Sequence, residues 1–314
     1  MEPWYCTREE VKASPDYKHT ARNNAQIDQK ISAGARSMEG YLLRRYYPEL
    51  RTVTWVYPRK DSSPANQLWL GPNEIISLTS LTAGGTAISA SDYTLKRWDE
   101  RDEPPYQYIE LDDTASFTDP IVAVGLFGYR NDETQVGTLS AALAGSLTAT
   151  ASVAWTTPNI GVGSILRIGS ERMFVTERSW VDSAQNVGVA LTARADNVTV
   201  AVTTGSSFSV DEFILVDSER MRIVEIAGNN LTVKRQEDGT VLAAHALNAD
   251  IYTQTGVQLE RAKLGTALAA HLQDAPIYLF GAPSLVRDLN IAEAIVGMEQ
   301  AQSAYARVIG GGER

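Results

Sequence analysis

The chain has 314 residues, of which 44% are hydrophobic and 21% charged, proportions that are ordinary for a globular protein with a sizeable core. Its formal net charge of −10 excludes tight wrapping of nucleic acid, which depends on many cationic contacts to phosphate. The single cysteine, Cys6, excludes an internal disulfide and zinc sites built from several thiolates, and it fits a reducing cytosol.

The acidic charge lies mainly after residue 60. Residues 1–60 hold 11 Lys/Arg and 7 Asp/Glu, whereas residues 61–130 hold 4 and 11. The uncharged run 134–166 is rich in Thr, Ser and Gly, so we expect strands and loops there and no membrane span. The first residues lack a basic stretch followed by an apolar core, so we expect no secretory signal.

Two helices are predicted before Pro48. Thr7 and Glu10 have the spacing of a capping box, which predicts a short helix that ends at "SPD", residues 14–16. A longer helix is predicted from about Thr20 to Tyr46, with Pro48 stopping it. Its apolar stripe repeats at steps of three and four residues and consists of Ile27, Ile31, Ala35, Met38, Leu42 and Tyr46.

A β-rich region is predicted from about Val53 to Tyr129. The runs "VTWVY", "LWL", "YIELDD" and "IVAVGLFGY" are rich in β-branched and aromatic residues and predict strands. "EIISLTSLTAGGTAI" predicts a hairpin, because Gly84 and Gly85 supply the positive φ angles of a tight turn. The charged stretch "DERDEPPY" predicts an exposed loop.

A second β-rich region, from 138 to 280, contains internal duplication. "GSERMFV" at Gly169 recurs as "DSERMRI" at Asp217, an offset of 48 residues. "RQEDGTVLAAHALNADIY" at Arg235 recurs as "RAKLGTALAAHLQDAPIY" at Arg261, an offset of 26 with 10 of 18 positions identical. We interpret this as one β module repeated in tandem, with an extra terminal half-copy at Arg261.

A closing helix is predicted from about Leu285 to Ile309, with Ser284 as N-cap and Asp288 in its first turn. Its expected apolar stripe consists of Leu285, Leu289, Ala292, Ile295, Met298, Gln302 and Tyr305. Because each terminal helix needs a partner for its apolar face, we expect the two to pack together. The predicted fold class is therefore α+β: terminal helices packed as a helical base, a β-rich middle and an inserted repeated β module. Residues 1–135 and 283–314 would form one domain and residues 138–280 the inserted one.

The paired histidines, His245 and His271, are interpreted as structural. A metal site needs at least three converging ligands, and equivalent positions in two copies of a repeat do not converge. We expect each imidazole to hold a loop by bonding to a backbone carbonyl. Tight turns and capping hydrogen bonds around these loops are assigned to Gly239, Thr240, Gly265 and Thr266.

The remaining candidate sites are clusters of charge. Asp99, Glu100, Asp102 and Glu103 could bind a divalent cation, but charge runs are usually solvated, and Asp112 and Asp113 are expected in a turn. No phosphate-binding glycine loop, nucleophile elbow or HExxH motif is present, so we expect neither an enzyme nor a cofactor.

Two adjacent arginines, Arg44 and Arg45, end the long helix. They either offset the helix dipole or contact a protein partner or passing DNA. Further candidates for such contacts are Arg287, Tyr305 and Arg307 in the closing helix.

Four segments resemble a known family. "IDQKISAGARSMEGYLLRRYYP" is similar to the long helix of the head–tail connector (adaptor) proteins of long-tailed bacteriophages. "LWLGPNEIISLTSLTAGGTAISASDYTL", "IVAVGLFGYRND" and "PSLVRDLNIAEAIVGMEQAQSAYARV" resemble the family's hairpin segment, a later strand and its closing helix, in the same order. Residues 138–280 depart from the smaller members, and "SERMRIVEIAGNNLTVKRQEDGTVLAAH" resembles a β module common in phage virion proteins.

The resemblance implies a non-catalytic virion protein at the head–tail interface, assembled in the host cytoplasm. Such a protein forms a homo-oligomeric ring, usually twelvefold, beneath the portal protein, and carries a tail-side connector, stopper or tail terminator protein. Genomic DNA would pass through without specific binding, as an acidic tunnel repels its backbone, and no membrane is involved. The alternative is a β-repeat decoration or receptor-binding protein that binds carbohydrate, with Trp155 and Trp180 stacking on sugars.

Overall fold

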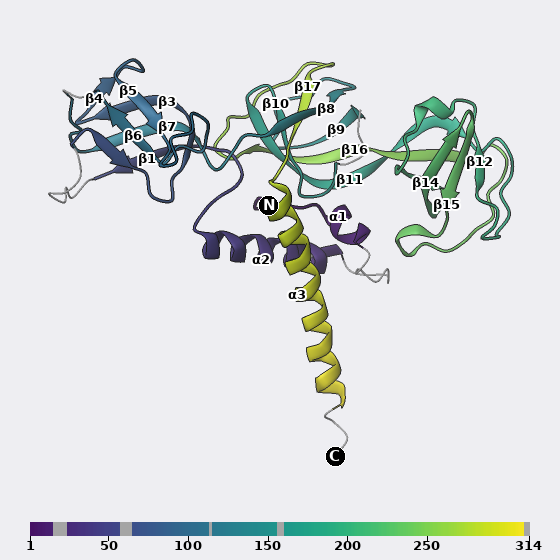
Figure 1. Ribbon diagram of the computed structural model, residues 1–314. Coiled ribbons are helices and arrows are strands. Elements are labelled where there is room, and N and C mark those ends of the chain that lie inside the picture. The colour runs from purple at the N-terminus through teal and green to yellow at the C-terminus, as the bar shows by residue number, and fades with distance from the viewer. Residues whose placement is uncertain (15–23, 57–64, 113–114, 156–159, 311–314) are drawn as a thin grey trace.

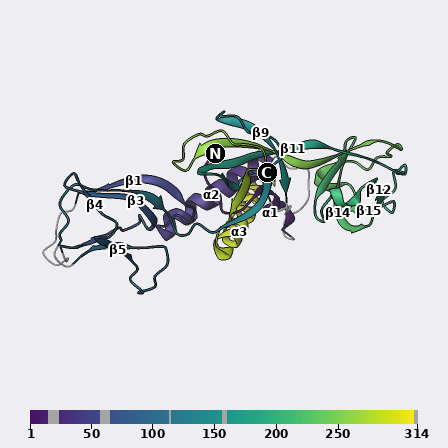
Figure 2. The ribbon, with the colours of Figure 1, turned by 90° about the horizontal axis from the view of Figure 1, so that it is seen from above.

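The computed structural model describes residues 1–14, 24–56, 65–112, 115–155 and 160–310, with side chains described as far as residue 300. Three β units lie in a row above a helical base, and the last helix projects away from them (Figure 1). Seen from above, the same row is visible with the projecting helix nearly end-on (Figure 2). The predicted α+β class, with packed terminal helices and a β-rich middle, is confirmed.

The base consists of α1 (Arg8–Ala13), α2 (Asn24–Leu42) and α3 (Ser284–Gly310). Thr7 and Glu10 form the predicted capping box, in which each side chain bonds the other residue's backbone amide. The core between the helices is apolar and contains Trp4, Cys6, Val11, Ile27, Ile31, Val162, Ala294, Ile295 and Met298.

Helices α2 and α3 cross at Gly34. A side chain there would be tightly crowded, since a Cβ would lie 3.0 Å from Asn290 Nδ2 and 3.2 Å from Glu293 Cβ. Asn290 is fully buried; its Nδ2 donates to the Ile31 carbonyl (3.1 Å), and its Oδ1 accepts from the Tyr5 amide (3.2 Å). This asparagine ties both helices to the N-terminal segment.

Helix α2 ends earlier than the sequence predicted. It stops at Leu42, and Leu43 takes a left-handed φ of 51°, so Pro48 is not the terminator. Tyr46 leaves the helical path because its amide donates to the Tyr5 hydroxyl and its ring packs edge-on against Tyr5 at 5.7 Å. Tertiary contacts thus override the helical periodicity of the last turn, and the predicted stripe member Leu42 is exposed.

The predicted apolar stripe of α3 was wrong in its first half. Leu285, Leu289 and Ala292 are exposed, whereas the face toward α2 and the first β module consists of Val286, Asn290, Ala294, Ile295 and Met298. Both faces of α3 carry apolar residues, so periodicity alone did not identify the buried one.

The first β unit pairs two antiparallel sheets around one core. One sheet has the order β1-β7-β3-β4 and the other β2-β6-β5. Gly84 and Gly85 form the predicted tight turn between β3 and β4, with φ angles of 56° and 81°. The strands are β1 (Glu49–Trp55), β2 (Gln67–Trp69), β3 (Ile75–Ala83), β4 (Thr86–Ile88), β5 (Tyr93–Lys96), β6 (Tyr108–Leu111) and β7 (Ile121–Phe127).

The remaining strands belong to one large antiparallel sheet that forms two modules. They are β8 (Glu133–Leu139), β9 (Thr148–Trp155), β10 (Ile165–Ile168), β11 (Glu171–Asn186), β12 (Thr199–Ala201), β13 (Phe213–Val216), β14 (Glu219–Ala227), β15 (Asn230–Lys234), β16 (Asp250–Lys263) and β17 (Pro276–Phe280). In the first module the pairing runs β11-β10-β17-β8-β9-β16 and back to β11, which closes a barrel. Strands β11 and β16 extend from this barrel into the second module (Figure 1).

The two modules share their strand register. The hairpin pair Ile165↔Phe174 recurs as Phe213↔Arg222, each residue shifted by 48. A bulge between Val175 and Glu177 recurs between Ile223 and Glu225. The modules are therefore duplicates strand by strand, each with its own apolar core.

The duplication is nested, which corrects the tandem arrangement with an extra half-copy. In the second module, Ala227 and Asn230 pair across the two-residue turn Gly228-Asn229. The equivalent pair in the first module is Ser179↔Gly256, and the whole second module replaces the turn between them. The segment at Arg261 is accordingly the C-terminal half of the first module.

The second module turns a modified face toward the base. In the first module, Phe174 and Leu264 pack into the base core, but their equivalents are Arg222 and Asp238. These two charged residues line a cleft of about 470 Å³ opposite α1. Lys12 of α1 crosses to Asp238 with an N–O distance of 2.7 Å.

Nesting predicts that residues 180–255 can be replaced by Gly-Asn. The remaining chain should fold with its free energy of unfolding lowered by about 1–3 kcal/mol. The deletion removes Asp238, the partner of Lys12 in a surface ion pair, and the Gln254 and Thr255 carbonyls that accept from Arg178 and Trp155. Circular dichroism and urea unfolding measure this. The control variant replaces residues 180–256 by the same Gly-Asn. This shifts β16 by one residue against its neighbours and exposes the core face of the strand, so the control should not fold. Equal behaviour of the two deletions would contradict nesting.

Candidate partner interface

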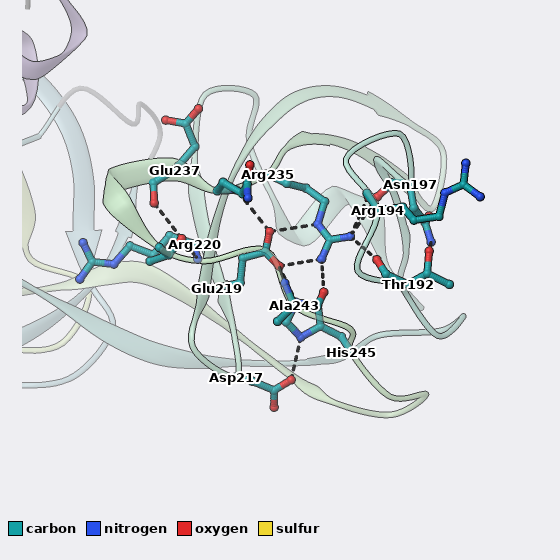
Figure 3. Close-up of polar contacts among 12 residues, drawn as sticks. Thr192, Arg194, Asn197, Asp217, Glu219, Arg220, Arg235, Glu237, Ala243 and His245 are labelled. Carbon is teal, nitrogen blue, oxygen red and sulfur yellow. Dashed lines mark hydrogen bonds and ion pairs between the residues drawn. The ribbon is translucent and has the colours of Figure 1, made fainter. Parts of the chain in front are cut away.

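Both copies of the repeat contain a buried carboxylate held by an arginine and a histidine, shown for the second module in Figure 3. In that module, Arg235 Nη2 and Nε donate to the two oxygens of Glu219 at 2.6 and 3.0 Å. His245 places Nε2 2.9 Å from Glu219 and Nδ1 2.7 Å from Asp217. The amide of Ala243 also donates to Glu219, at 3.0 Å. Every group needed to neutralise this carboxylate comes from the loop that follows β15.

The first module repeats the network with the same residue types. Arg261 Nη2 and Nε donate to Glu171 at 2.5 and 3.1 Å, and His271 Nε2 lies 2.8 Å from the same carboxylate. Gly169 stands where the second module has Asp217, so His271 has one carboxylate partner and His245 has two. Both networks lie inside separate modules and do not converge, so their role is to fix loops.

The turn residues serve the same loops. Thr240 Oγ1 donates to the Glu237 carbonyl at 2.9 Å and accepts from the Arg220 amide at 3.1 Å. Thr266 makes the equivalent bonds to the Lys263 carbonyl and the Arg172 amide. Gly239 and Gly265 adopt φ angles of 77° and 76°. The expected bond from each imidazole to a backbone carbonyl is wrong: the side-chain partners are carboxylates, because each loop encloses a buried glutamate that needs a donor.

The pKa of Glu219 is lowered to about 2. Burial opposes ionisation of this carboxyl, but the hydrogen bonds from Arg235, the Ala243 amide and His245 outweigh burial. The pKa of Glu171 is lowered by the equivalent balance of burial against Arg261 and His271.

Acid should therefore destabilise the second module. Since the folded pKa of Glu219 lies below the unfolded value of about 4.3, its contribution is present above that pH and disappears as pH falls toward 2. The expected loss is on the order of 3 kcal/mol between about pH 5 and pH 2. Urea unfolding at a series of pH values measures it, and the acid dependence should shrink when Glu219 is replaced by glutamine. An unchanged pH dependence in that variant would contradict the assignment.

The acidic cluster on the first β unit is neutralised by arginines. Arg97 Nη2 and Arg101 Nε lie 2.8 and 3.5 Å from Asp99, and Arg130 Nη2 lies 3.2 Å from Glu103. Within the described residues no three His, Cys, Asp or Glu side chains form a group that could hold a metal ion. The Asp112 carbonyl accepts the Ala115 amide in a turn, and Asp113 lies outside the described residues.

A groove with exposed tryptophans lies where α2 meets the first β unit. It measures about 580 Å³ and is lined by Leu42, Leu43, Arg44, Trp69, Gly71, Pro72, Glu74, Trp98 and Gln107. Trp98 is 77% exposed and Leu43 is 74% exposed. Trp69 is held in place by stacking on Tyr108 at 4.7 Å between ring centroids. Exposed Trp beside Arg is typical of an interaction hot spot, and the exposed leucines add apolar surface. We call this surface the tryptophan groove.

Arg44 and Arg45 do not end the helix as predicted, because α2 stops at Leu42 and both arginines follow it. The two differ in role. Arg44 Nη2 donates to the buried carboxylate of Glu74 at 2.8 Å and lines the tryptophan groove. Arg45 Nη1 pairs with Glu49 at 2.7 Å, with the arginine half exposed. Arg44 thus supports the wall of the groove, whereas Arg45 is half exposed and lines an adjoining cavity that shares Pro72 and Glu74 with the groove.

Alanine at Arg44 should cost about 1–3 kcal/mol of unfolding free energy, because it leaves the Glu74 carboxylate buried without its cation. Alanine at Arg45 should change the same quantity by less than about 0.5 kcal/mol, as exposed ion pairs contribute little. Chemical unfolding of both variants measures the difference. Equal losses would show that Glu74 does not depend on Arg44.

The other candidate contact residues lie on α3. Arg287 is half exposed, with Nη1 3.8 Å from Glu10 and Nε 3.3 Å from Asp288. Tyr305 and Arg307 fall on the last turns of α3, where the helix projects from the body, but their side chains lie outside the described residues. Arg44 pairs with Glu74 in the first β unit, whereas Arg287 lies beside Glu10 of α1 and Asp288 of α3, so the two arginines contact different parts of the chain.

The tryptophans of the carbohydrate alternative are partly covered. The indole of Trp155 donates to the Thr255 carbonyl at 3.0 Å and packs against the first module's core. The Arg220 guanidinium lies 5.7 Å from the ring centroid of Trp180. Carbohydrate binding stays a prediction, and glycan binding by the full chain would support it.

Comparison with known proteins gives no relative: no family model, curated protein or solved structure matches this chain. Among the described residues, no helix is long and apolar enough to cross a membrane.

Sequence reasoning missed the tryptophan groove. It requires residues from α2, β2 and the loop around Trp98, which are distant in the sequence. The available signal was Trp98 itself, a large aromatic inside a charged stretch where no core was expected.

Proposed function

We propose that this protein is a virion structural protein, a head-to-tail adaptor that forms a ring beneath a portal protein and lets DNA pass. The resemblance of its terminal and hairpin segments to adaptor proteins is the origin of the proposal. The helical base supports it, because α2 and α3, two of the segments that carry the resemblance, pack together and α3 extends beyond the body, where a neighbouring ring can receive it.

One observation carries most of the weight: the described residues of a single chain leave two groups of apolar side chains exposed, on α3 and in the tryptophan groove. Exposed apolar groups can mark interaction sites, and two different ones on the same chain are what a head-to-tail ring requires. The chain has a formal net charge of −10, which suits passage of DNA without adhesion. The buried networks of the β modules supply rigid loops and no reacting group.

The test is cryo-electron microscopy of the chain mixed with a portal protein from its phage. A ring of rotational symmetry, expected to be twelvefold, should stack on the portal. Free monomers beside bare portals would overturn the proposal. A portal from an unrelated phage is the control, because nonspecific adhesion would decorate both portals alike.

A further inference from the structure

Helix α3 carries a second apolar face. Leu285, Leu289, Ala292 and Val296 follow one another at steps of four, three and four residues, and all four are exposed. Leu285 is 79% exposed. This spacing places them in one row, the spacing by which helices pack on one another. We call this row the α3 stripe, and nothing in the described part of the same chain covers it.

The tryptophan groove has a complementary shape and chemistry. It is concave, whereas the α3 stripe is a ridge of aliphatic side chains. Its tryptophan faces and leucines provide apolar area, and Trp69 is already fixed by stacking, so little side-chain freedom is lost on binding. A helix ridge in a preformed apolar groove is a recurring mode of protein recognition.

Charge favours binding of the α3 stripe in the groove over packing of two stripes on each other. The stripe is bordered by the exposed carboxylates of Asp288, Glu293 and Glu299. Two stripes packed on each other would bring these acids together, which costs free energy. Arg44 on the wall of the groove already pairs with Glu74, which lines the groove too. Arg45 lines an adjoining cavity that shares Pro72 and Glu74 with the groove. Its half-exposed guanidinium is the cation that the acids of the stripe would meet, in exchange for its surface pair with Glu49.

The two surfaces lie apart within one chain. Helix α3 crosses α2 near Gly34, whereas the groove is lined by Leu42, the last residue of α2, and by residues of the first β unit. The ribbon shows that this end of α2 lies away from α3 (Figure 1). The stripe of one chain thus reaches the groove of another. Because the two surfaces differ, each bound copy leaves one of each free, and repetition closes a ring or extends a chain.

We propose that the α3 stripe of one copy docks in the tryptophan groove of a second copy of this chain. The inference rests on the proposed function, since it names the contact between neighbouring subunits of the ring. It also assigns Arg45 to the neighbour's acidic border rather than to DNA.

Disulfide trapping between two single variants of the full chain tests the contact. Leu289→Cys and Trp98→Cys are purified separately, mixed under mild oxidation and resolved without reductant. The native Cys6 is buried and stays in both variants. We expect a covalent heterodimer as the main product, at least tenfold above a control mixture of Trp98→Cys with Leu272→Cys. Leu272 is as exposed as Leu285 but lies on the first β module.

The mixture also separates the inference from the proposed function. Heterodimer no more abundant than in the control, or Leu289→Cys pairing mainly with itself, overturns the inference. Glu293→Arg in the Leu289→Cys chain should lower trapping severalfold, and Arg45→Glu in its partner should restore it. Trapping without a ring on the portal retains the contact and rejects the adaptor. A ring on the portal without trapping retains the adaptor and rejects the contact.

Discussion

Replacing Glu219 with glutamine is expected to lower the free energy of unfolding of the second module by about 3–5 kcal/mol, the usual cost of breaking a buried ion pair from one side. Glu219 and Arg235 are almost completely buried, so the guanidinium would lose its counter-charge with no water to replace it. Tryptophan and circular-dichroism signals during urea unfolding measure the loss. Amide hydrogen exchange should place it in β13, β14 and β15.

The module supplies matched controls for this result. Asp217 bonds the same histidine but is 59% exposed, so Asp217→Asn should cost less than about 1 kcal/mol. Glu171→Gln should cause a loss of the size expected for Glu219→Gln, localised in the first module. Equal, small effects of Glu219→Gln and Asp217→Asn would show that burial of the carboxylate is not what makes the network important.

Replacing Asn290 with leucine should cost about 2–3 kcal/mol of unfolding free energy and loosen α3 from the base. Leucine keeps the branching at Cγ but is bulkier, and it leaves the buried Tyr5 amide without an acceptor; an unsatisfied buried donor costs about 1–3 kcal/mol. The bonds to Ile31 and Cys6 are lost as well. Hydrogen exchange of α3, together with chemical unfolding, measures both effects.

A neighbouring substitution controls for changes in helix propensity and charge. Asp288→Asn lies on the same helix, is exposed and should change the unfolding free energy by less than about 0.5 kcal/mol. If Asn290→Leu were as stable as the wild type, the asparagine would be dispensable to the base, and helix packing at Gly34 alone would hold α3.

Residues close together in the sequence predicted the helices and turns better than they predicted which elements pack against each other. The Thr7 capping box and the Gly84-Gly85 turn depend on residues close in the sequence, and both formed as expected. The end of α2 did not, because a contact with Tyr5 decides where Tyr46 goes. The buried face of α3 was misjudged for a related reason: α3 has two apolar faces, and only the position of α2 determines which is covered.

The repeat shows a different kind of limit. Offsets of 48 and 26 residues were visible in the sequence, and so were the glutamate, arginine and histidine of each copy. Their pairing was not, because Glu171 bonds Arg261 across the whole second module whereas Glu219 bonds the nearby Arg235. Identity between segments says which residues are equivalent, and strand register says which belong together.

Nesting also imposes an order on how the chain becomes structured during synthesis. The second module, residues 181–255, is contiguous and holds all its strands before the ribosome reaches β17. The first module cannot close at this stage. Its Arg261 lies in β16, after the second module in the chain, and must be synthesised before it can pair with Glu171. Until then the apolar strands β8, β9 and β10 have no closed barrel to enter. The inner module therefore completes first, and the outer barrel and the helix that follows it are the last parts of the protein to be secured.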